Sequence, residues 1–104
     1  MIFKVFWKNI EFLEVEKVND IYYSRLIVEN VNKVLDEGYP ITFLKNIKVI
    51  DKKIPKLIEN RIPSLDYIEE KLNKKDSIED MIIDYIEKTN CKRVTDYLSI
   101  NVEK

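Results

Sequence analysis

Histidine is absent from this 104-residue sequence, and glycine and cysteine each occur only once. Without histidine, the chain lacks the most common general base, nucleophile activator and metal ligand. One glycine cannot supply a phosphate-binding loop of the Walker or dinucleotide type, because both motifs need several glycines. These absences argue against the familiar enzyme classes. We therefore predict that the chain is not an enzyme and has no catalytic, cofactor-binding or metal-binding residues.

The single cysteine, Cys91, has no partner for an internal disulfide. The sequence also shows no signal-peptide pattern and no apolar run near the ~20 residues that span a bilayer. A cytoplasmic, reducing environment is therefore the expected setting. Lys92 and Arg93 could lower the pKa of the Cys91 thiol, but a partly buried small side chain near a helix end is the preferred interpretation.

Charged side chains are plentiful, but their pattern predicts neither a metal site nor a nucleic-acid surface. The formal net charge is −1 although 36% of the residues are charged, so no strongly basic field attracts nucleic acid. No carboxylate spacing argues for Mg²⁺. The carboxylates on expected helices lie among lysines, as is typical of solvated faces: Glu69, Glu70, Glu79, Asp80 and Asp84.

Hydrophobic residues make up 45% of the chain, which is enough to build the core of one domain over residues 1–104. Alternating apolar residues predict strands over 2–7 and 10–17, and a stretch that is apolar on both faces predicts a third strand over 21–28. Tight turns at Lys8-Asn9 and Asn19-Asp20 join them. A last strand over 97–102 is expected to pair back into this meander. The inward-facing residues are expected to include Phe3, Val5, Trp7, Leu13, Val15, Leu98, Ile100 and Val102.

Helical patterns predominate in the second half of the chain. Asn30 is the expected cap of a short helix that runs to Glu37, with Gly38 at its C-terminal end. Residues 41–44 suggest a weak strand or extended segment, and 45–53 a loop or edge strand. Further helices are predicted over 55–60 with Pro55 at the first position, over 65–73 with Ser64 as cap, and over 77–88 after a capping box that starts at Asp76. The apolar stripe of the last helix is Ile78, Met81, Ile82, Tyr85 and Ile86.

The predicted fold class is therefore α+β, with a small antiparallel sheet packed against three to four short helices. The sheet consists of the N-terminal meander and the C-terminal strand. Aromatic residues make up 11% of the chain, and some, including Tyr22, Tyr23 and Tyr39, fall near turns or strand ends. Exposed aromatic side chains near arginine are typical of protein interfaces.

One stretch bounded by prolines carries a resemblance to a known family. The segment Leu57-Ile58-Glu59-Asn60-Arg61-Ile62-Pro63 resembles the Phe-Phe-x-Asn-Leu-Leu-Pro segment in the N-terminal subdomain of HipA-type toxin kinases. Residues 3–9 resemble the opening strand and turn of that subdomain, although Ile10 stands where the family has glycine. Residues 78–87 resemble its helix, and 89–100 the turn and closing strand. Arg61 departs from the family, which has an aliphatic residue there.

The resemblance implies a HipA-N-terminal-like domain without the kinase core that follows it in HipA. A copy of this kind is similar to the HipS antitoxins of tripartite HipBST toxin–antitoxin systems, which bind and neutralise a separate HipT kinase. It thus implies a HipT-like Ser/Thr kinase as partner, together with a helix-turn-helix HipB-like protein. The predicted partner-binding residues are Tyr39, Phe43, Asn60 and Arg61.

Alternatives stay open at this point. Asn60 could cap or bridge backbone groups between short helices, which is the preferred interpretation for that residue, whereas both roles stay open for Arg61. A second functional class is a phage or mobile-element protein that inhibits a host nuclease or binds nucleic acid. Aromatic and lysine residues interleaved on strands would suit single-stranded nucleic acid. A metal-dependent enzyme that uses carboxylates is a third, weaker alternative.

Overall fold

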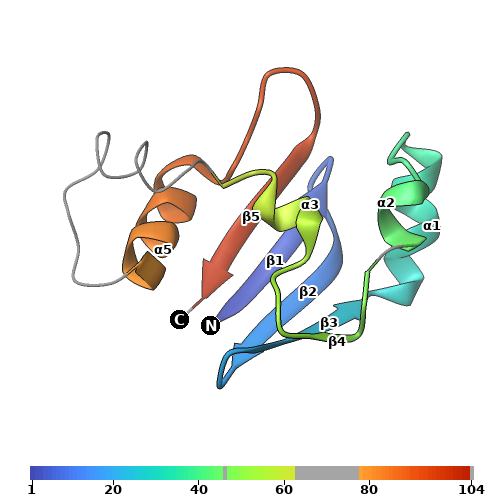
Figure 1. Ribbon diagram of the computed structural model, residues 1–104. Coiled ribbons are helices and arrows are strands. Elements are labelled where there is room, and N and C mark those ends of the chain that lie inside the picture. The colour runs from blue at the N-terminus through green and yellow to red at the C-terminus, as the bar shows by residue number, and fades with distance from the viewer. Residues whose placement is uncertain (46, 63–77, 104) are drawn as a thin grey trace.

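Strands from both ends of the chain form one antiparallel sheet. The computed structural model describes residues 1–45, 47–62 and 78–103. The five-stranded sheet has the order β4-β3-β2-β1-β5 (Figure 1). Its strands are β1 (Ile2–Trp7), β2 (Ile10–Val18), β3 (Ile21–Leu26), β4 (Ile50–Asp51) and β5 (Leu98–Glu103). The described helices are α1 (Val28–Asp36), α2 (Thr42–Lys45), α3 (Lys56–Glu59) and α5 (Ile78–Thr89). The predicted α+β class is confirmed, including the pairing of the last strand with the first.

Both predicted hairpin turns are present, and neither needs glycine. Lys8 and Asn9 have φ values of 49° and 66°, and Asn19 and Asp20 have φ values of 49° and 65°. Positive φ at both central residues is the signature of the type I′ turn, whose twist matches that of the flanking strands. Asn and Asp tolerate this left-handed conformation better than most residues. The asparagines therefore replace the missing glycines.

One face of the sheet holds the core. Phe3, Val5 and Trp7 alternate along β1 and are all buried, as predicted from their period of two. The β1–β2 register shifts between Val5 and Phe6, so that Phe12 is left without a partner on β1. This bulge lets the adjacent residues Phe12 and Leu13 both be fully buried. The helices add side chains to the same cluster: Val34 from α1, Ile58 from α3 and Ile86 from α5.

The helices surround this face from several sides. In Figure 1, α5 lies beside β5, while α1 and α2 lie together at the opposite side of the sheet. The short helix α3 lies between them, and its Ile58 packs into the core. No helix among the described residues is long and apolar enough to cross a membrane.

The start of α1 differs from the prediction. The third strand ends at Leu26 instead of residue 28, and α1 begins at Val28 with Ile27 as an N-cap that lacks a side-chain hydrogen bond. Asn30, the predicted cap, lies within the helix, where its Nδ2 donates a 2.8 Å hydrogen bond to the Glu11 carbonyl. The asparagine therefore ties the helix to β2, a tertiary contact that local patterns do not reveal. The predicted role of Gly38 is confirmed by its φ of 94°.

The segment after Gly38 is also more helical than predicted. Residues 42–45 form α2, so the expected extended segment over 41–44 is wrong; the Pro40 carbonyl accepts a hydrogen bond from the Phe43 N–H and starts the turn. Residues 45–53 were predicted to form a loop or edge strand; Ile50–Asp51 form the short edge strand β4, and Lys45 ends α2. Pro55 is the N-cap of α3 instead of its first helical residue.

The last helix is confirmed, with one correction to its buried face. In α5, Met81, Ile83 and Ile86 are buried, whereas Ile82 and Tyr85 are half-buried at the edge of the core. Ile83 was not part of the predicted stripe. The predicted helix over 65–73, its Ser64 cap and the capping box at Asp76 lie outside the described residues.

Candidate functional site

The predicted partner-binding residues lie around one concavity. Tyr39, Phe43, Asn60 and Arg61 come from the loop after α1, from α2 and from the end of α3, yet all four line a groove of about 390 Å³. We call it the aromatic groove, and the other residues that line it are Trp7, Pro40, Leu57, Arg93, Asp96 and Leu98. The structure thus brings the four residues together. Their contact with a partner stays a prediction.

Aromatic rings form the floor and part of the rim of this groove. Tyr39 is only 5% exposed, and its ring centroid lies 5.2 Å from that of Trp7 and 4.7 Å from that of Phe12. The Trp7 indole N–H donates a 2.9 Å hydrogen bond to the Glu37 carbonyl, which holds the end of α1 against the sheet. Phe43 packs edge-on against Tyr39 at 5.9 Å but stays 55% exposed. The floor is therefore fixed, and the rim presents a ring to solvent.

The Tyr39 hydroxyl remains protonated over the physiological range. Burial raises its pKa to about 12, with a smaller increase from Asp96 and a partial decrease from Arg61. A buried phenol loses the water that would stabilise its anion, which is why the neutral form is favoured. Tyr39 can therefore act only as a neutral hydrogen-bonding group in this groove.

Arg61 is bonded within the chain. The residue is 8% exposed, its Nη1 donates a 3.1 Å hydrogen bond to the Cys91 carbonyl, and its Nη2 forms an ion pair with Asp96. Asp96 also accepts a 3.2 Å hydrogen bond from the Leu98 N–H. Burial raises the pKa of the Asp96 carboxyl, but the bonds from Arg61 and Leu98 outweigh it and hold that pKa below its usual value. Arg61 thus joins the end of α3 to the loop between α5 and β5.

Unlike the buried Arg61, Asn60 has an exposed side chain at the rim of the aromatic groove. It is the C-cap residue of α3, and its carbonyl accepts a 2.8 Å hydrogen bond from Arg93 Nη2. The Asn60 carbonyl therefore bridges α3 to the loop before β5. The preferred interpretation placed Asn60 between two short helices, and the helix predicted after it lies outside the described residues. The Asn60 side chain remains available for contact.

Sequence reasoning missed several residues of the groove. Trp7 and Leu98 are paired across β1 and β5, so the strand pattern could have placed them together. Arg93 and Asp96 lie in the loop before β5, and no local pattern marks them as neighbours of α3. Their place depends on how the two ends of the domain pack.

Cys91 is a structural residue just after α5. It is 2% exposed, and burial raises the pKa of its thiol to about 11, with Arg61 and Arg93 opposing this increase only in part. The suggestion that neighbouring cations lower the thiol pKa is therefore wrong in its net direction. The preferred interpretation, a buried small side chain at a helix end, is confirmed.

Asp80 on α5 is exposed, as expected of a solvated helix face, whereas the Asp84 side chain is only 21% exposed. Asp84 forms a 3.2 Å ion pair with Lys88 one turn later. Among the described residues, no group of three or more His, Cys, Asp or Glu side chains is arranged to hold a metal ion. Glu69 and Glu70 lie outside the described part of the chain.

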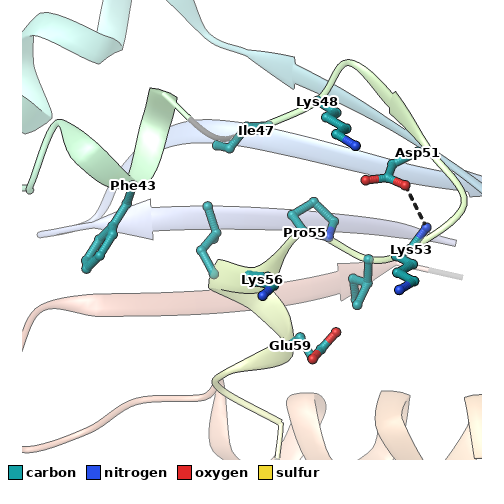
Figure 2. Close-up of a pocket in the computed structure, with 10 residues that line it drawn as sticks. Phe43, Ile47, Lys48, Asp51, Lys53, Pro55, Lys56 and Glu59 are labelled. Atoms are coloured by element: carbon teal, nitrogen blue, oxygen red, sulfur yellow. Dashed lines mark hydrogen bonds between the residues drawn. The ribbon is translucent and has the colours of Figure 1, made fainter.

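A second concavity adjoins the first and was not predicted. This lysine groove, of about 520 Å³, is lined by Phe43, Ile47, Lys48, Asp51, Lys53, Ile54, Pro55, Lys56, Leu57 and Glu59. Figure 2 shows Phe43 on α2 at one side and Lys48, Asp51 and Lys53 at the other, with Pro55 and α3 between them. Asp51 accepts a 3.2 Å hydrogen bond from the Lys53 N–H, which stabilises the bend after β4. Phe43 and Leu57 line both grooves.

Comparisons with known proteins give no match: no family model, no curated protein and no solved structure matches this chain. The resemblance to the HipA N-terminal subdomain therefore rests on sequence patterns alone, namely the motif over 57–63 and the flanking segments 3–9, 78–87 and 89–100. In the structure, residues 57–59 of this motif belong to α3 and residues 60–62 follow it, whereas Pro63 lies outside the described residues.

Proposed function

We propose that this chain is a non-catalytic protein-binding module, an antitoxin that docks on a HipA/HipT-like Ser/Thr kinase in the cytoplasm and neutralises it. A helix-turn-helix HipB-like protein is the proposed third component. The motif over 57–63 supports the identity of the partner. The aromatic groove supports the mode of action, because it gathers the kinds of side chain that dominate binding energy at interfaces.

The observation that carries this proposal is the position of Phe43. Its ring is 55% exposed, yet it is held against Tyr39, whose own ring is fixed by Trp7 and Phe12. A preorganised aromatic side chain loses little conformational entropy on binding. Arg93 lies exposed in the same groove, and aromatic residues and arginine are enriched among interface hot spots. Docking through this groove needs no chemistry from the chain itself.

Inhibition by docking is physically sufficient. A stable interface of standard size buries roughly 800 Å² per partner, a small part of the 6995 Å² surface of this chain. A domain of this size placed over a kinase cleft would exclude substrate or hold the kinase in an open state. The proposed antitoxin therefore acts by coverage of the kinase surface.

The test is co-expression with a HipT-like kinase encoded beside this chain, scored by growth rescue and by co-purification. Phe43→Ala should weaken binding by about 2 kcal/mol, as for a hot-spot aromatic residue. Tyr23→Ala is the matched control, because Tyr23 is a 41% exposed aromatic on β3 that does not line the groove. If the kinase stays toxic with the unaltered chain and does not co-purify, the proposal is wrong. Equal binding of the kinase by Phe43→Ala and Tyr23→Ala would show that the aromatic groove is not the docking surface.

A further inference from the structure

The aromatic groove and the lysine groove form one continuous surface. Phe43 and Leu57 line both concavities and separate them as a shared apolar ridge. Phe43 on this ridge is 55% exposed. Ile41, which lies two residues before Phe43 in the sequence, is 51% exposed. Exposed bulky apolar side chains between two concavities are typical of surfaces that receive an anchor residue from a partner.

The charge of this surface is opposite in sign to that of the whole chain. The cations that line the two grooves outnumber the carboxylates, Asp51, Glu59 and Asp96, whereas the formal net charge of the chain is −1. These cations are Lys48, Lys53, Lys56, Arg61 and Arg93. The surface is therefore locally basic.

Most of this positive charge is not neutralised within the described structure. Arg61 is paired with Asp96. Among the ion pairs between described residues, none involves Lys48, Lys53, Lys56 or Arg93, and all four residues are exposed. Arg93 uses one N–H group on the Asn60 carbonyl, which leaves other donors of its guanidinium for a ligand.

We propose that the joined grooves bind an acidic segment of the partner protein, which inserts a bulky apolar side chain beside Phe43 and Leu57 and sets carboxylates against the exposed lysines and Arg93. This inference rests on the proposed function, because it names the chemistry of the segment through which the partner docks. Complementary charge accelerates association and selects the partner, and the apolar anchor contributes most of the affinity.

The same cations could face phosphates, but the surface suits a peptide better. Binding of single-stranded nucleic acid relies on several aromatic platforms along a basic track, whereas Phe43 is the one exposed aromatic side chain among the described residues that line the two grooves, since Trp7 and Tyr39 are buried. Asp51 and Glu59 lie in the lysine groove and repel an evenly charged phosphate backbone. A peptide can place neutral or basic residues opposite these carboxylates.

In the test, the full chain is titrated with a short acetylated peptide of alternating Glu and Leu with a central Phe. Binding is measured by the fluorescence of Trp7, the single tryptophan of the chain, which lines the aromatic groove. We expect saturable binding that weakens with added salt. A peptide with Lys in place of Glu, and one with Ser in place of Leu and Phe, should bind at least about tenfold more weakly. No saturable change with the acidic peptide, or tighter binding of oligo-dT, overturns the inference.

Charge-reversal variants locate the site. Lys56→Glu should weaken binding of the acidic peptide by about tenfold, whereas Lys33→Glu on the exposed surface of α1 should not change it. Equal effects of the two variants contradict the inference. In co-purification with the kinase, retention by Lys56→Glu would overturn the inference and leave the antitoxin proposal standing. Failure of the unaltered chain to bind the kinase would overturn that proposal, and the peptide titration would still decide the inference.

Discussion

The ion pair between Arg61 and Asp96 should contribute measurably to stability, and Asp96→Asn tests this. Asparagine keeps an oxygen that can accept the hydrogen bond from the Leu98 N–H, but it removes the charge that faces Arg61. The Arg61 side chain is 7% exposed, so its charge would remain buried without a counter-ion. Breaking one side of a buried pair costs about 3–5 kcal/mol.

The expected loss is smaller than that range, because the Asp96 side chain is 30% exposed and water can replace part of the interaction. We expect a decrease of about 2 kcal/mol in the free energy of unfolding. At roughly 4 °C per kcal/mol for a domain of this size, the Tm should fall by roughly 8 °C. Asp96→Ala should cost about 1 kcal/mol more, because the Leu98 N–H also loses its acceptor.

The pH dependence supplies an independent check. Burial acts to raise the pKa of Asp96, but the bonds from Arg61 and Leu98 lower it below the usual value of 3.8. A carboxyl whose pKa is lower in the folded state stabilises the fold above its unfolded pKa, and this contribution is lost as pH falls through the folded pKa. The difference in Tm between the unaltered chain and Asp96→Asn should therefore persist at neutral pH and shrink below pH 3.8.

The assay is thermal unfolding followed by circular dichroism across this pH range, with Glu103→Gln as control. Glu103 forms a 2.9 Å ion pair with Lys4 but is 57% exposed, so its removal should lower the Tm much less than Asp96→Asn does. If Asp96→Asn costs no more than Glu103→Gln, the burial argument is wrong. A difference in Tm that stays the same at acidic and neutral pH would contradict the assignment of the effect to charge.

Three further predictions concern the backbone and the buried phenol. Gly38→Ala should lower the free energy of unfolding in urea by about 1 kcal/mol. Because φ of Gly38 is 94° and an added Cβ would meet no atom within 4 Å, backbone strain is the whole cost. An unchanged free energy of unfolding would refute this. Asp20→Gly should raise the Tm by a few degrees, because it creates the Asn-Gly pair that type I′ turns favour, and a decrease would show that the Lys17–Asp20 pair matters more. Since the folded pKa of Tyr39 is raised to about 12, its contribution to stability should be complete below its usual pKa of 10.0 and lost between pH 10 and 12. Tyr39→Phe should remove this alkaline loss, and spectrophotometric titration of the tyrosines should show the late ionisation disappear.

Much of the sheet follows from local sequence. The alternation of Phe3, Val5 and Trp7 predicted a buried face, and Asn at both hairpin turns predicted where the chain reverses. Strand alternation and turn residues are patterns that extend over only a few residues, so they predict local structure before the fold is known. The stripe on the last helix was recognisable for the same reason, although its buried edge includes Ile83.

Only the tertiary structure decided the beginning of α1, the helical form of 42–45 and the composition of the grooves. Asn30 bonds to Glu11 across the fold instead of capping its own helix, and Arg61 finds its carboxylate on Asp96, far away in the chain. Such contacts depend on packing between distant segments, and local propensity does not encode them. The sequence by itself determined the α+β pattern and the absence of imidazole chemistry. Three-dimensional packing decided that the aromatic and basic residues of separate segments meet in one surface, because burial of a shared core brings those segments together.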